Sequence, residues 1–333
     1  MITPWEVSGE IDYQKLIREF GTSPLTPELL EELEKRAGRP LPTVLRRGFF
    51  FSHRDLKRAL EKGFFIYTGR GPSGKMHLGH LPPFMLSKWL QDAFGVNVYI
   101  MLSDDEKYVH KRDLDWDEID QYSLDNARDI AALGFDPDKT FIFRDTEYIK
   151  NMYKGVLAIA RKTTFSTARA VFGFTNDTNI GLIFYPSIQI APTFFEKKVA
   201  LIPAGIDQDP YWRIQRDIAP YFGYEKIAAI HSKFFPSLKG LDAKMSSSQP
   251  DTVIWLDEDE KSLKRKIMNA FSGGQPTIEE HRRLGGKPEI DIAYLLLYYF
   301  FEEDDNKIKE IEESYRSGAL LTGELKLYAY EKI

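Results

Sequence analysis

Two short segments carry the residue types that handle phosphate groups. The first, residues 67–80 (YTGRGPSGKMHLGH), joins a hydrophobic run at 64–67 to a turn-rich loop and ends in HLGH. Apolar residues recur at helical spacing over 86–94, so the pattern predicts a strand, a glycine-rich loop and a helix start. The unpaired N–H groups of a helix N-terminus suit a phosphate, Gly79 allows close approach of a ligand to the backbone, and the flanking histidines can donate hydrogen bonds to phosphate oxygens.

The second segment is Lys244-Met245-Ser246-Ser247-Ser248. A lysine with adjacent hydroxyl groups can hold the departing phosphates of a triphosphate. Each segment alone has a plainer explanation, since histidines often cap helices and KMSSS is also typical of a polar surface loop. The two in this order, with an α/β pattern between them, indicate nucleotide chemistry more strongly than either does alone.

The elements that position these segments alternate in type. Continuously apolar, strand-like runs are separated by helix-like patterns; the runs lie at 64–69, 96–102, 140–145, 200–205 and 227–232, and the helices include 80–94, 117–133 and 208–222. This alternation predicts an α/β fold, a Rossmann-like parallel sheet covered on both faces. Ligands of such sheets bind beyond the carboxyl ends of the strands, where the first segment lies.

Beyond residue 253 the pattern becomes helical throughout. Helical segments are expected at about 258–271, 277–284, 290–302 and 304–315, with the apolar run 295–301 as a buried helix. We therefore expect three parts: an N-terminal extension (1–60), a Rossmann-type catalytic domain with a dimer-interface insertion (61–252), and a helical domain (253–333). A helical pattern that starts near Gly323 is still running at Ile333, so the last domain is expected to be truncated.

Composition excludes several classes of protein. The chain has 333 residues, 43% hydrophobic and 29% charged, which is ordinary for a globular protein of two or three domains. No apolar run is long enough to span a membrane and no signal peptide is present, so a cytoplasmic location is expected. The absence of cysteine excludes disulfides, a thiol nucleophile and cysteine zinc sites. A net charge of −5 argues against sequence-blind nucleic-acid binding, and basic clusters at 46–58 and 261–266 are more simply explained as solvated helix faces.

Taken together, the motifs resemble a class I aminoacyl-tRNA synthetase, specifically the tryptophanyl type of the archaeal and eukaryotic branch. The stretches that carry this resemblance span nearly the whole chain: PWEV (4–7), FFFSHRD (49–55), YTGRGPSG (67–74), HLGH (77–80), DDEKY (104–108), FGFT (172–175), YPSIQIAP (185–192), IPAGIDQDPYWR (202–213), KMSSS (244–248), FSGG (271–274) and SGALLTGELK (317–326). Such an enzyme activates L-tryptophan with ATP to tryptophanyl-AMP and pyrophosphate, then transfers tryptophan to tRNA(Trp).

The resemblance assigns roles to residues of both segments. It implies ATP binding by Arg70, Gly71, His77, Gly79, His80, Ile206, Asp209, Lys244, Ser246 and Ser247. Among these, His77, His80, Lys244 and Ser246 would be catalytic, through positioning and charge stabilisation. Mg²⁺ would accompany the nucleotide, and no metal site made by protein side chains is expected. Ser248 stands where the familiar KMSKS form has its second lysine.

The same resemblance implies a tryptophan pocket lined by Tyr67, Met101, Glu106, Gln189, Gln208 and Trp212. Glu106 would pair with the substrate ammonium, aided by the two glutamines, and Tyr67 would accept a hydrogen bond from the indole N–H. One departure stands out, because relatives place a polar acceptor where this chain has Met101, and a thioether is only a weak acceptor. Tyrosyl relatives carry an aspartate at the position of Pro192, so tyrosine is disfavoured as the substrate.

The resemblance also implies an anticodon-binding role for the helical domain, with 261–266 and 271–276 as contacts, and a homodimer with 147–185 near the interface. Three alternatives remain open at this point. They are a tyrosyl-tRNA synthetase, a catalytically silent paralogue that binds RNA, and a nucleotidylyltransferase that is not a synthetase.

Overall fold

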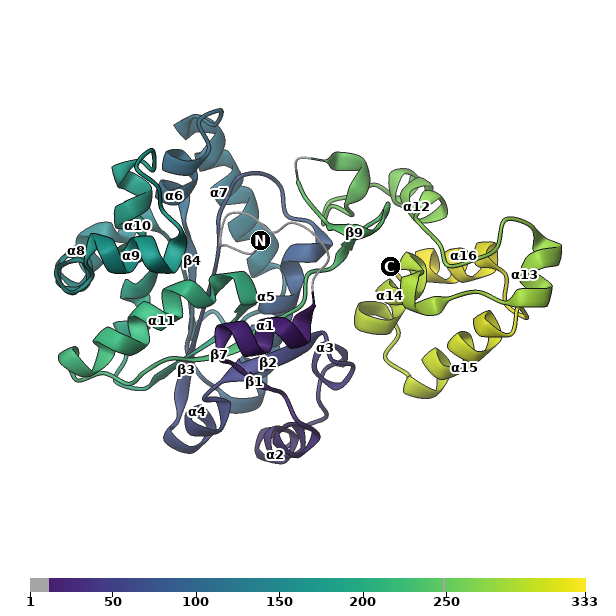
Figure 1. Cartoon of the computed structure of the whole chain (residues 1–333), viewed down its shortest axis with the longest axis horizontal. Coiled ribbons are helices and arrows are strands. Elements are labelled where there is room, and N and C mark those ends of the chain that lie inside the picture. The colour runs from purple at the N-terminus through teal and green to yellow at the C-terminus, as the bar shows by residue number, and fades with distance from the viewer. Residues whose placement is uncertain (1–11, 248) are drawn as a thin grey trace. The chain divides into compact units, whose positions relative to one another are not determined.

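The computed structural model describes residues 12–247 and 249–333 (Figure 1). The chain divides into two compact units: unit 1 comprises Met1–Pro40, Phe50–Met76 and Leu81–Lys233, and unit 2 comprises Leu41–Phe49, His77–His80 and Phe234–Ile333. The predicted boundary at residue 252 thus falls inside unit 2, and the predicted N-terminal extension contributes to both units. The PWEV stretch and Ser248 lie outside the described residues.

Unit 1 is built on a sheet of seven strands in the order β1-β2-β7-β6-β3-β4-β5. Five of them run parallel: β3 (Phe64–Arg70), β4 (Val98–Leu102), β5 (Thr140–Arg144), β6 (Val199–Gly205) and β7 (Ala228–Ser232). Two short strands, β1 (Ser23–Pro24) and β2 (Phe50–Arg54), add antiparallel pairing beside β7. The predicted α/β parallel sheet is therefore confirmed, with an antiparallel edge that the sequence pattern did not indicate.

The parallel strands follow the doubly wound order. Numbered along the chain, they stand in space as 3-2-1-4-5, so the winding reverses between β3 and β6. In doubly wound sheets ligands bind outside the carboxyl ends of the strands at such a switch point. The loops after β3 and β6 both begin there.

The helices of unit 1 include the predicted segments 80–94, 117–133 and 208–222, the last of which is α-helical only to Ile218. They are α1 (Tyr13–Phe20), α2 (Pro27–Ala37), α4 (Leu56–Lys62), α5 (Leu81–Phe94), α6 (Asp104–His110), α7 (Trp116–Ala131), α8 (Asp145–Lys162), α9 (Phe165–Phe172), α10 (Ile180–Ile190) and α11 (Asp209–Ile218). Helix α2 shows how nearby residues set the two ends of a helix. The Thr26 hydroxyl accepts from the Leu29 N–H, Pro27 opens the first turn, and Gly38 ends the helix in the left-handed conformation.

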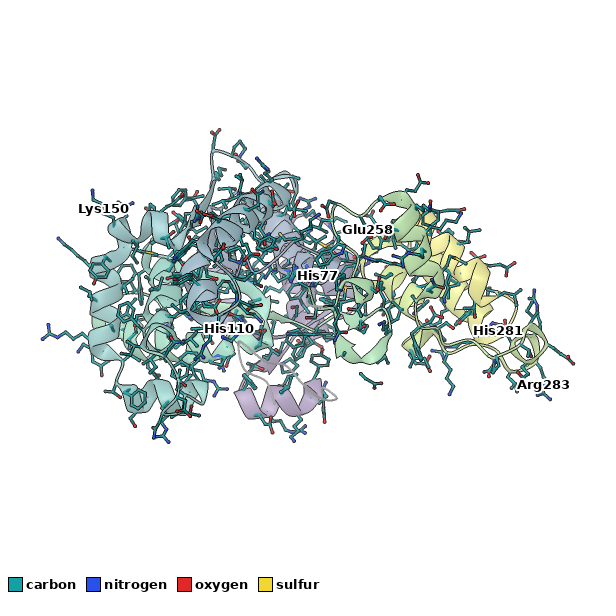
Figure 2. All side chains as sticks on the ribbon, turned by 90° about the horizontal axis from the view of Figure 1, so that it is seen from above. His77, His110, Lys150, Glu258, His281 and Arg283 are labelled. Carbon is teal, nitrogen blue, oxygen red and sulfur yellow. The ribbon has the colours of Figure 1, made fainter. Side chains whose placement is uncertain are left out.

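Unit 2 is helical apart from the two-stranded hairpin of β8 (Pro236–Ser237) and β9 (Gly240–Lys244). Its helices are α3 (Thr43–Arg46), α12 (Glu260–Asn269), α13 (Ile278–Leu284), α14 (Ile292–Leu296), α15 (Asp305–Arg316) and α16 (Thr322–Lys332), and a π-helical turn over Leu297–Phe301 extends α14. The apolar run 295–301 is helical, as predicted. His281 and Arg283 mark α13 in Figure 2.

Both basic clusters prove to be partly structural. In unit 2, Arg47 is buried and its Nη2 lies 2.6 Å from Oδ1 of Asp305. Lys266 is also buried, and its Nζ lies 2.5 Å from Glu258. A buried cation that already has a carboxylate partner contributes to the fold rather than to a nucleic-acid surface. Within the described residues, no helix is long and apolar enough to cross a membrane.

Candidate active site

The loop after β3 lies at the switch point and offers a cation. A Cβ on Gly69 would lie 2.8 Å from the Met101 carbonyl oxygen, so glycine permits the close approach of β3 to β4 here. The next residue, Arg70, donates through Nη1 to the Gly71 carbonyl, while its buried Nε has no hydrogen-bond partner among the described residues. Burial lowers the Arg70 pKa to about 10 and Glu106 opposes the shift, so the guanidinium stays charged at neutral pH. An unpaired buried donor on a cation suits an anionic ligand.

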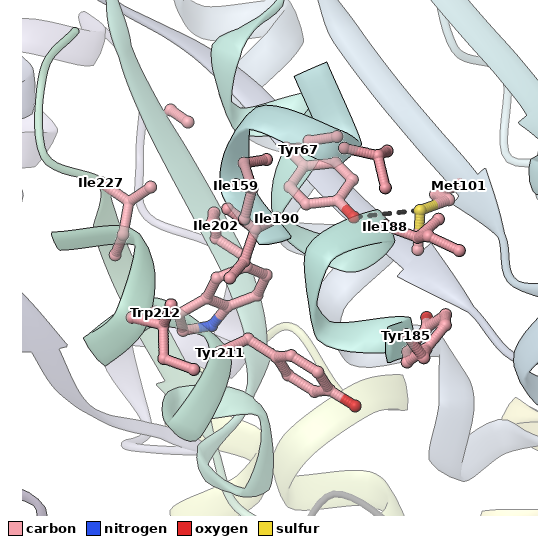
Figure 3. Close-up of a cluster of buried hydrophobic side chains, with 14 of the residues drawn as sticks. Tyr67, Met101, Ile159, Tyr185, Ile188, Ile190, Ile202, Tyr211, Trp212 and Ile227 are labelled. Carbon is pink, nitrogen blue, oxygen red and sulfur yellow. Dashed lines mark hydrogen bonds between the residues drawn. The ribbon is translucent and has the colours of Figure 1, made fainter. Parts of the chain in front are cut away.

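The predicted indole-binding residues come together in one apolar cluster of unit 1. Tyr67, Met101 and Trp212 are each about 99% buried, with a T-shaped contact of 6.0 Å between the ring centroids of Tyr67 and Trp212. The Tyr67 hydroxyl donates to the Gln189 carbonyl oxygen at 2.8 Å and lies 3.2 Å from the Met101 sulfur, as Figure 3 shows. Because its proton is committed, the phenolic oxygen offers lone pairs as acceptors.

The Trp212 Nε1 atom adds a second polar group to this cluster. It is buried, and no described residue accepts a hydrogen bond from it. Unsatisfied buried donors are uncommon in folded proteins, and they point to a group that arrives with the ligand. The cluster therefore combines apolar walls with one acceptor and one donor.

The polar residues predicted for the amino-acid backbone lie on three different elements. Glu106, on α6, is buried and pairs with Lys107 Nζ at 2.5 Å. On α10, the side-chain oxygen of Gln189 accepts from the Tyr185 hydroxyl. Gln208, in the short turn that leads to α11, donates to Asp207 at 3.1 Å. Helix α6 and the Ile206–Gln208 turn directly follow β4 and β6 at the carboxyl edge of the sheet, and Gln189 is linked to β3 through its contact with Tyr67.

Asp209 has a different environment from the one predicted for an ATP contact. It is fully buried at the start of α11, where Arg54 Nη2 donates to it at 2.8 Å and Arg213 Nε at 3.0 Å. His231 lies 3.7 Å away, and its pKa falls to about 4 because burial outweighs the attraction of Asp209. The carboxylate is thus engaged inside unit 1, where it ties α11 to β2 and β7.

In unit 2, the backbone of the HLGH segment forms hydrogen bonds within the segment and to residues 254–255. The Leu78 N–H donates to the Ile254 carbonyl at 2.9 Å, and His77 forms an isolated antiparallel bridge with Trp255. The other backbone N–H groups are also used: His77 donates to Nδ1 of His80 at 3.1 Å, Gly79 to Nδ1 of His77 at 3.1 Å, and His80 to the His77 carbonyl. The expectation of unpaired N–H groups at this helix start is therefore wrong for residues 77–80.

This arrangement sets the tautomer of both histidines. Since each Nδ1 accepts a backbone N–H, the neutral ring must carry its proton on Nε2. The two rings are stacked with centroids 3.6 Å apart, and His77, labelled in Figure 2, is 2% exposed. Phosphate recognition by this motif would use two imidazole Nε2–H donors rather than backbone amides.

The KMSSS segment contacts HLGH within unit 2. A Cβ on Gly79 would lie 3.0 Å from the His77 ring and 3.3 Å from the Met245 Cβ, so glycine occupies the space between the two motifs. Met245 is buried and donates its N–H to the Phe235 carbonyl, which anchors the segment. Lys244 Nζ lies 5.0 Å from the centroid of the Phe234 ring. Ser246 and Ser247 are half-buried.

The predicted ATP residues thus form two groups. Arg70, Gly71, Ile206 and Asp209 belong to unit 1, while His77, Gly79, His80, Lys244, Ser246 and Ser247 belong to unit 2. Sequence reasoning missed Lys107 beside Glu106, Trp255 against His77, and the Tyr185 hydroxyl on Gln189. Tyr185 stands in the YPSIQ stretch and could have been found there, whereas nothing in the sequence marked Trp255.

A doubly wound sheet with an HLGH and a KMSSS motif defines a nucleotide-using class I synthetase, and the comparisons agree. Residues 59–333 match the family described as tRNA synthetases class I (W and Y), so the chain belongs to that family. The predicted resemblance is confirmed. The chain is an aminoacyl-tRNA synthetase, with ATP and tRNA as substrates of its class.

Individual relatives narrow the similarity further. The chain is 60% identical to a tryptophan–tRNA ligase of Saccharolobus solfataricus and 59% identical to that of Sulfurisphaera tokodaii, covering 100% of this chain and 89% of each relative. It also resembles the crystal structure of a tryptophanyl-tRNA synthetase from Encephalitozoon cuniculi bound to tryptophan. That match has a TM-score of 0.88 and 36% identity, and it covers 98% of this chain and 92% of the other.

Proposed function

We propose that the protein is a tryptophan–tRNA ligase, which joins L-tryptophan to ATP as tryptophanyl-AMP and then transfers tryptophan to tRNA(Trp). The observation that carries the choice of amino acid is the buried cluster around Tyr67, whose phenolic proton is committed to the Gln189 carbonyl. The Tyr67 phenolic oxygen can therefore accept a hydrogen bond from an indole N–H, and the side chains of Met101 and Trp212 pack around it. The names of the relatives support the same substrate.

Tyrosine is the nearest competitor, and the lining disfavours it. A buried phenol needs a hydrogen-bond partner, and one left without a partner loses about 1–3 kcal/mol. Pro192, at the position of the tyrosyl aspartate, is buried in a 3₁₀ turn and its side chain offers neither donor nor acceptor. A non-catalytic paralogue is a second competitor, and the ordered contacts around both signature motifs argue against it.

In the first step, the tryptophan carboxylate oxygen attacks the α-phosphorus, a P–O bond forms, and the bond to the β-phosphate breaks to release pyrophosphate. We assign Arg70 to the α-phosphate, since its buried Nε has no partner in the described part of unit 1. His77 and His80 would donate through Nε2, and Lys244, Ser246 and Ser247 would stabilise the pyrophosphate. Catalysis then rests on positioning and on donors aimed at developing charge, with no enzyme nucleophile.

The side chains of the two motifs are hydrogen-bond donors, which bears on how Mg²⁺ would be held. Imidazole N–H and ammonium groups suit phosphate oxygens rather than a cation, so the chain's motif residues would bind the phosphates and Mg²⁺ would be held mainly by the nucleotide. Bound Mg²⁺ would neutralise charge on the leaving pyrophosphate.

Asp209 would act indirectly. Because its carboxylate accepts hydrogen bonds from Arg54 and Arg213, it would support the Ile206–Gln208 turn against the adenosine rather than contact ATP itself.

Three broader assignments complete the proposal. The helices of unit 2 from α12 onward would read the anticodon, with the 271–276 loop as a contact. A homodimer would form around 147–185, where Tyr153, Leu157 and Phe165 are exposed apolar side chains. The protein would act in the cytoplasm, where tRNA charging serves translation.

The test is ATP–pyrophosphate exchange with each of the twenty amino acids. Tryptophan should support exchange best, with tyrosine weaker by about 5- to 150-fold, the range that corresponds to about 1–3 kcal/mol for an unpaired buried phenol. Exchange that prefers another amino acid would refute the substrate, and no exchange with any of them would favour the silent paralogue.

A further inference from the structure

Three carboxyl groups gather at the carboxyl ends of β4 and β5, beside the proposed ammonium site. Asp104 and Asp105 start α6 and Asp145 starts α8, and one carboxylate oxygen from each lies within 4.8 Å of the other two. Glu106 follows directly on α6. Because like charges at this distance repel strongly in a buried setting, the way the cluster is neutralised decides what it does.

Asp104 is neutralised by groups of the fold. Arg144 Nε donates to its Oδ2 at 3.1 Å, and the Thr146 N–H donates to its Oδ1 at 3.1 Å. The Thr146 hydroxyl also donates to Oδ2. With an arginine already present, Asp104 needs no further cation.

Asp145 is in the opposite situation. Its side chain is completely buried, and no N–H or O–H group of the described residues donates to either carboxylate oxygen. The Asp105 carboxyl lies within hydrogen-bonding reach of it, and a hydrogen bond between two carboxyl groups requires a proton on the pair. Asp105 already accepts the Glu106 N–H at 2.7 Å, so it is the better site for the negative charge and Asp145 for the proton.

The groups that face this pair come from α6 itself and from four other elements. They are Asp104 and Glu106 on α6, with Lys107 and His110 beside Glu106, Arg144 on β5, Tyr67 on β3, Tyr185 on α10 and Tyr211 on α11. The cations are already paired: Arg144 with Asp104, and Lys107 with Glu106. Burial, followed by repulsion from neighbouring carboxylates, holds the Asp145 pKa well above its usual range, and the pKa of Asp105 is raised to about 6, chiefly by burial.

We propose that Asp145 holds a proton shared with Asp105 in the free protein, and that the pair releases it when the substrate ammonium binds at Glu106. The pair would act as a positioning element that supplies negative charge only when the cation is present. The inference rests on the proposed function, since it takes the ammonium group of an amino acid as the ligand.

The direction of the pH effect follows from linkage. An ammonium near the pair favours its ionised form, so the complex binds fewer protons than the free protein. Tryptophan affinity must therefore rise with pH while the free pair still holds its proton, and become constant once the free pair is ionised. One linked proton gives at most about a tenfold decrease in Kd per pH unit.

The experiment is calorimetric titration of the full chain with tryptophan from pH 5 to pH 7.5, in two buffers of different protonation enthalpy. The wild-type protein should release close to one proton on binding near pH 6, and its Kd should fall by up to about tenfold per pH unit. In Asp145→Asn the amide can still donate to Asp105 but cannot ionise, so proton release and the slope should both fall, and only the part that Asp105 contributes should remain. Two control variants should keep the slope: Asp113→Asn, an exposed aspartate, and His110→Gln, which removes the nearby imidazole.

The outcomes separate the two proposals. An unchanged slope in Asp145→Asn, or a slope lost in His110→Gln, would overturn the carboxyl pair while leaving tryptophan as the substrate. Failure of the wild-type protein to bind tryptophan at any pH would overturn the proposed function and this linkage with it.

Thermal unfolding tests the pair without any substrate. A carboxyl whose folded pKa is raised stabilises the fold while it is protonated and loses that contribution as pH rises through the folded pKa. Asp145→Asn should therefore raise Tm relative to wild type more at pH 8 than at pH 5. An equal difference at both pH values would contradict a shared proton.

Discussion

Removing the Tyr67 hydroxyl should weaken tryptophan binding by a predictable amount. In Tyr67→Phe the indole N–H would face the Met101 sulfur, a weak acceptor, and an unpaired buried donor costs about 1–3 kcal/mol. This corresponds to a loss of about 5- to 150-fold in affinity. The Gln189 carbonyl also loses its donor, so the free energy of unfolding should fall by about 1 kcal/mol.

The assay is a thermodynamic cycle in which one group is changed on the protein and one on the ligand. Calorimetry would compare L-tryptophan with its benzothiophene analogue, which keeps the shape of the side chain and lacks the N–H. Wild type should prefer L-tryptophan to the analogue. Tyr67→Phe should lose or reverse that preference, because the indole N–H is then buried without a good acceptor, whereas the analogue has no N–H to leave unpaired. The control variant is Tyr99→Phe. Tyr99 lies on β4, next to β3, and its hydroxyl donates to Glu196 at 3.1 Å, so this change should leave the discrimination intact. Equal discrimination by wild type and Tyr67→Phe would refute Tyr67 as the acceptor, and restored discrimination in Tyr67→Phe with Met101→Gln would support the geometry.

Three further predictions concern Lys244 of the KMSSS segment, Gly79 of the HLGH segment, and the ion pair between Arg54 and Asp209. Lys244→Ala should lower the rate of pyrophosphate exchange by at least about 100-fold, the scale of one transition-state donor, and leave tryptophan Kd unchanged; an equal loss in both would contradict a role on pyrophosphate. Gly79→Ala should slow exchange by about tenfold or more, because the added Cβ would push the HLGH and KMSSS segments apart. Gly323→Ala, where a Cβ meets no atom within 4 Å, should leave the rate unchanged. Equal exchange rates in the two variants would contradict a tight contact between the motifs. Arg54→Met should reduce the free energy of unfolding by about 3–5 kcal/mol in urea titrations, since Asp209 would lose its best partner in a fully buried site, and a loss below about 1 kcal/mol would be inconsistent with that role.

Most of the fold could be predicted because its signals are local. The β3 and β6 strands are continuously apolar, and helix α2 has a hydroxyl cap, a first-turn proline and a terminal glycine. Such patterns depend on residues close together in the chain. The hairpin of β8 and β9 was missed because short, polar strands gain their stability from pairing and packing rather than from propensity.

The candidate site shows the same division. The motifs HLGH and KMSSS selected the histidines and the lysine from the sequence, and their roles stay predictions. The sequence could not show that the Tyr67 proton is committed to the Gln189 carbonyl, since those two residues are far apart in the chain. Nor could it show that the backbone N–H groups of His77, Leu78, Gly79 and His80 already donate hydrogen bonds within the fold.

The sequence by itself determined the class of protein, the strand and helix pattern, and the residue types that can hold a nucleotide. Only the tertiary structure decided which polar groups are satisfied within the fold and which remain for a ligand. Asp104 and Asp145 illustrate the reason. Both are buried aspartates at a helix start, yet Arg144 neutralises one, and among the described residues no N–H or O–H group donates to the other. Protonation and charge depend on neighbours in space, and those neighbours come from strands and helices that are distant in the chain.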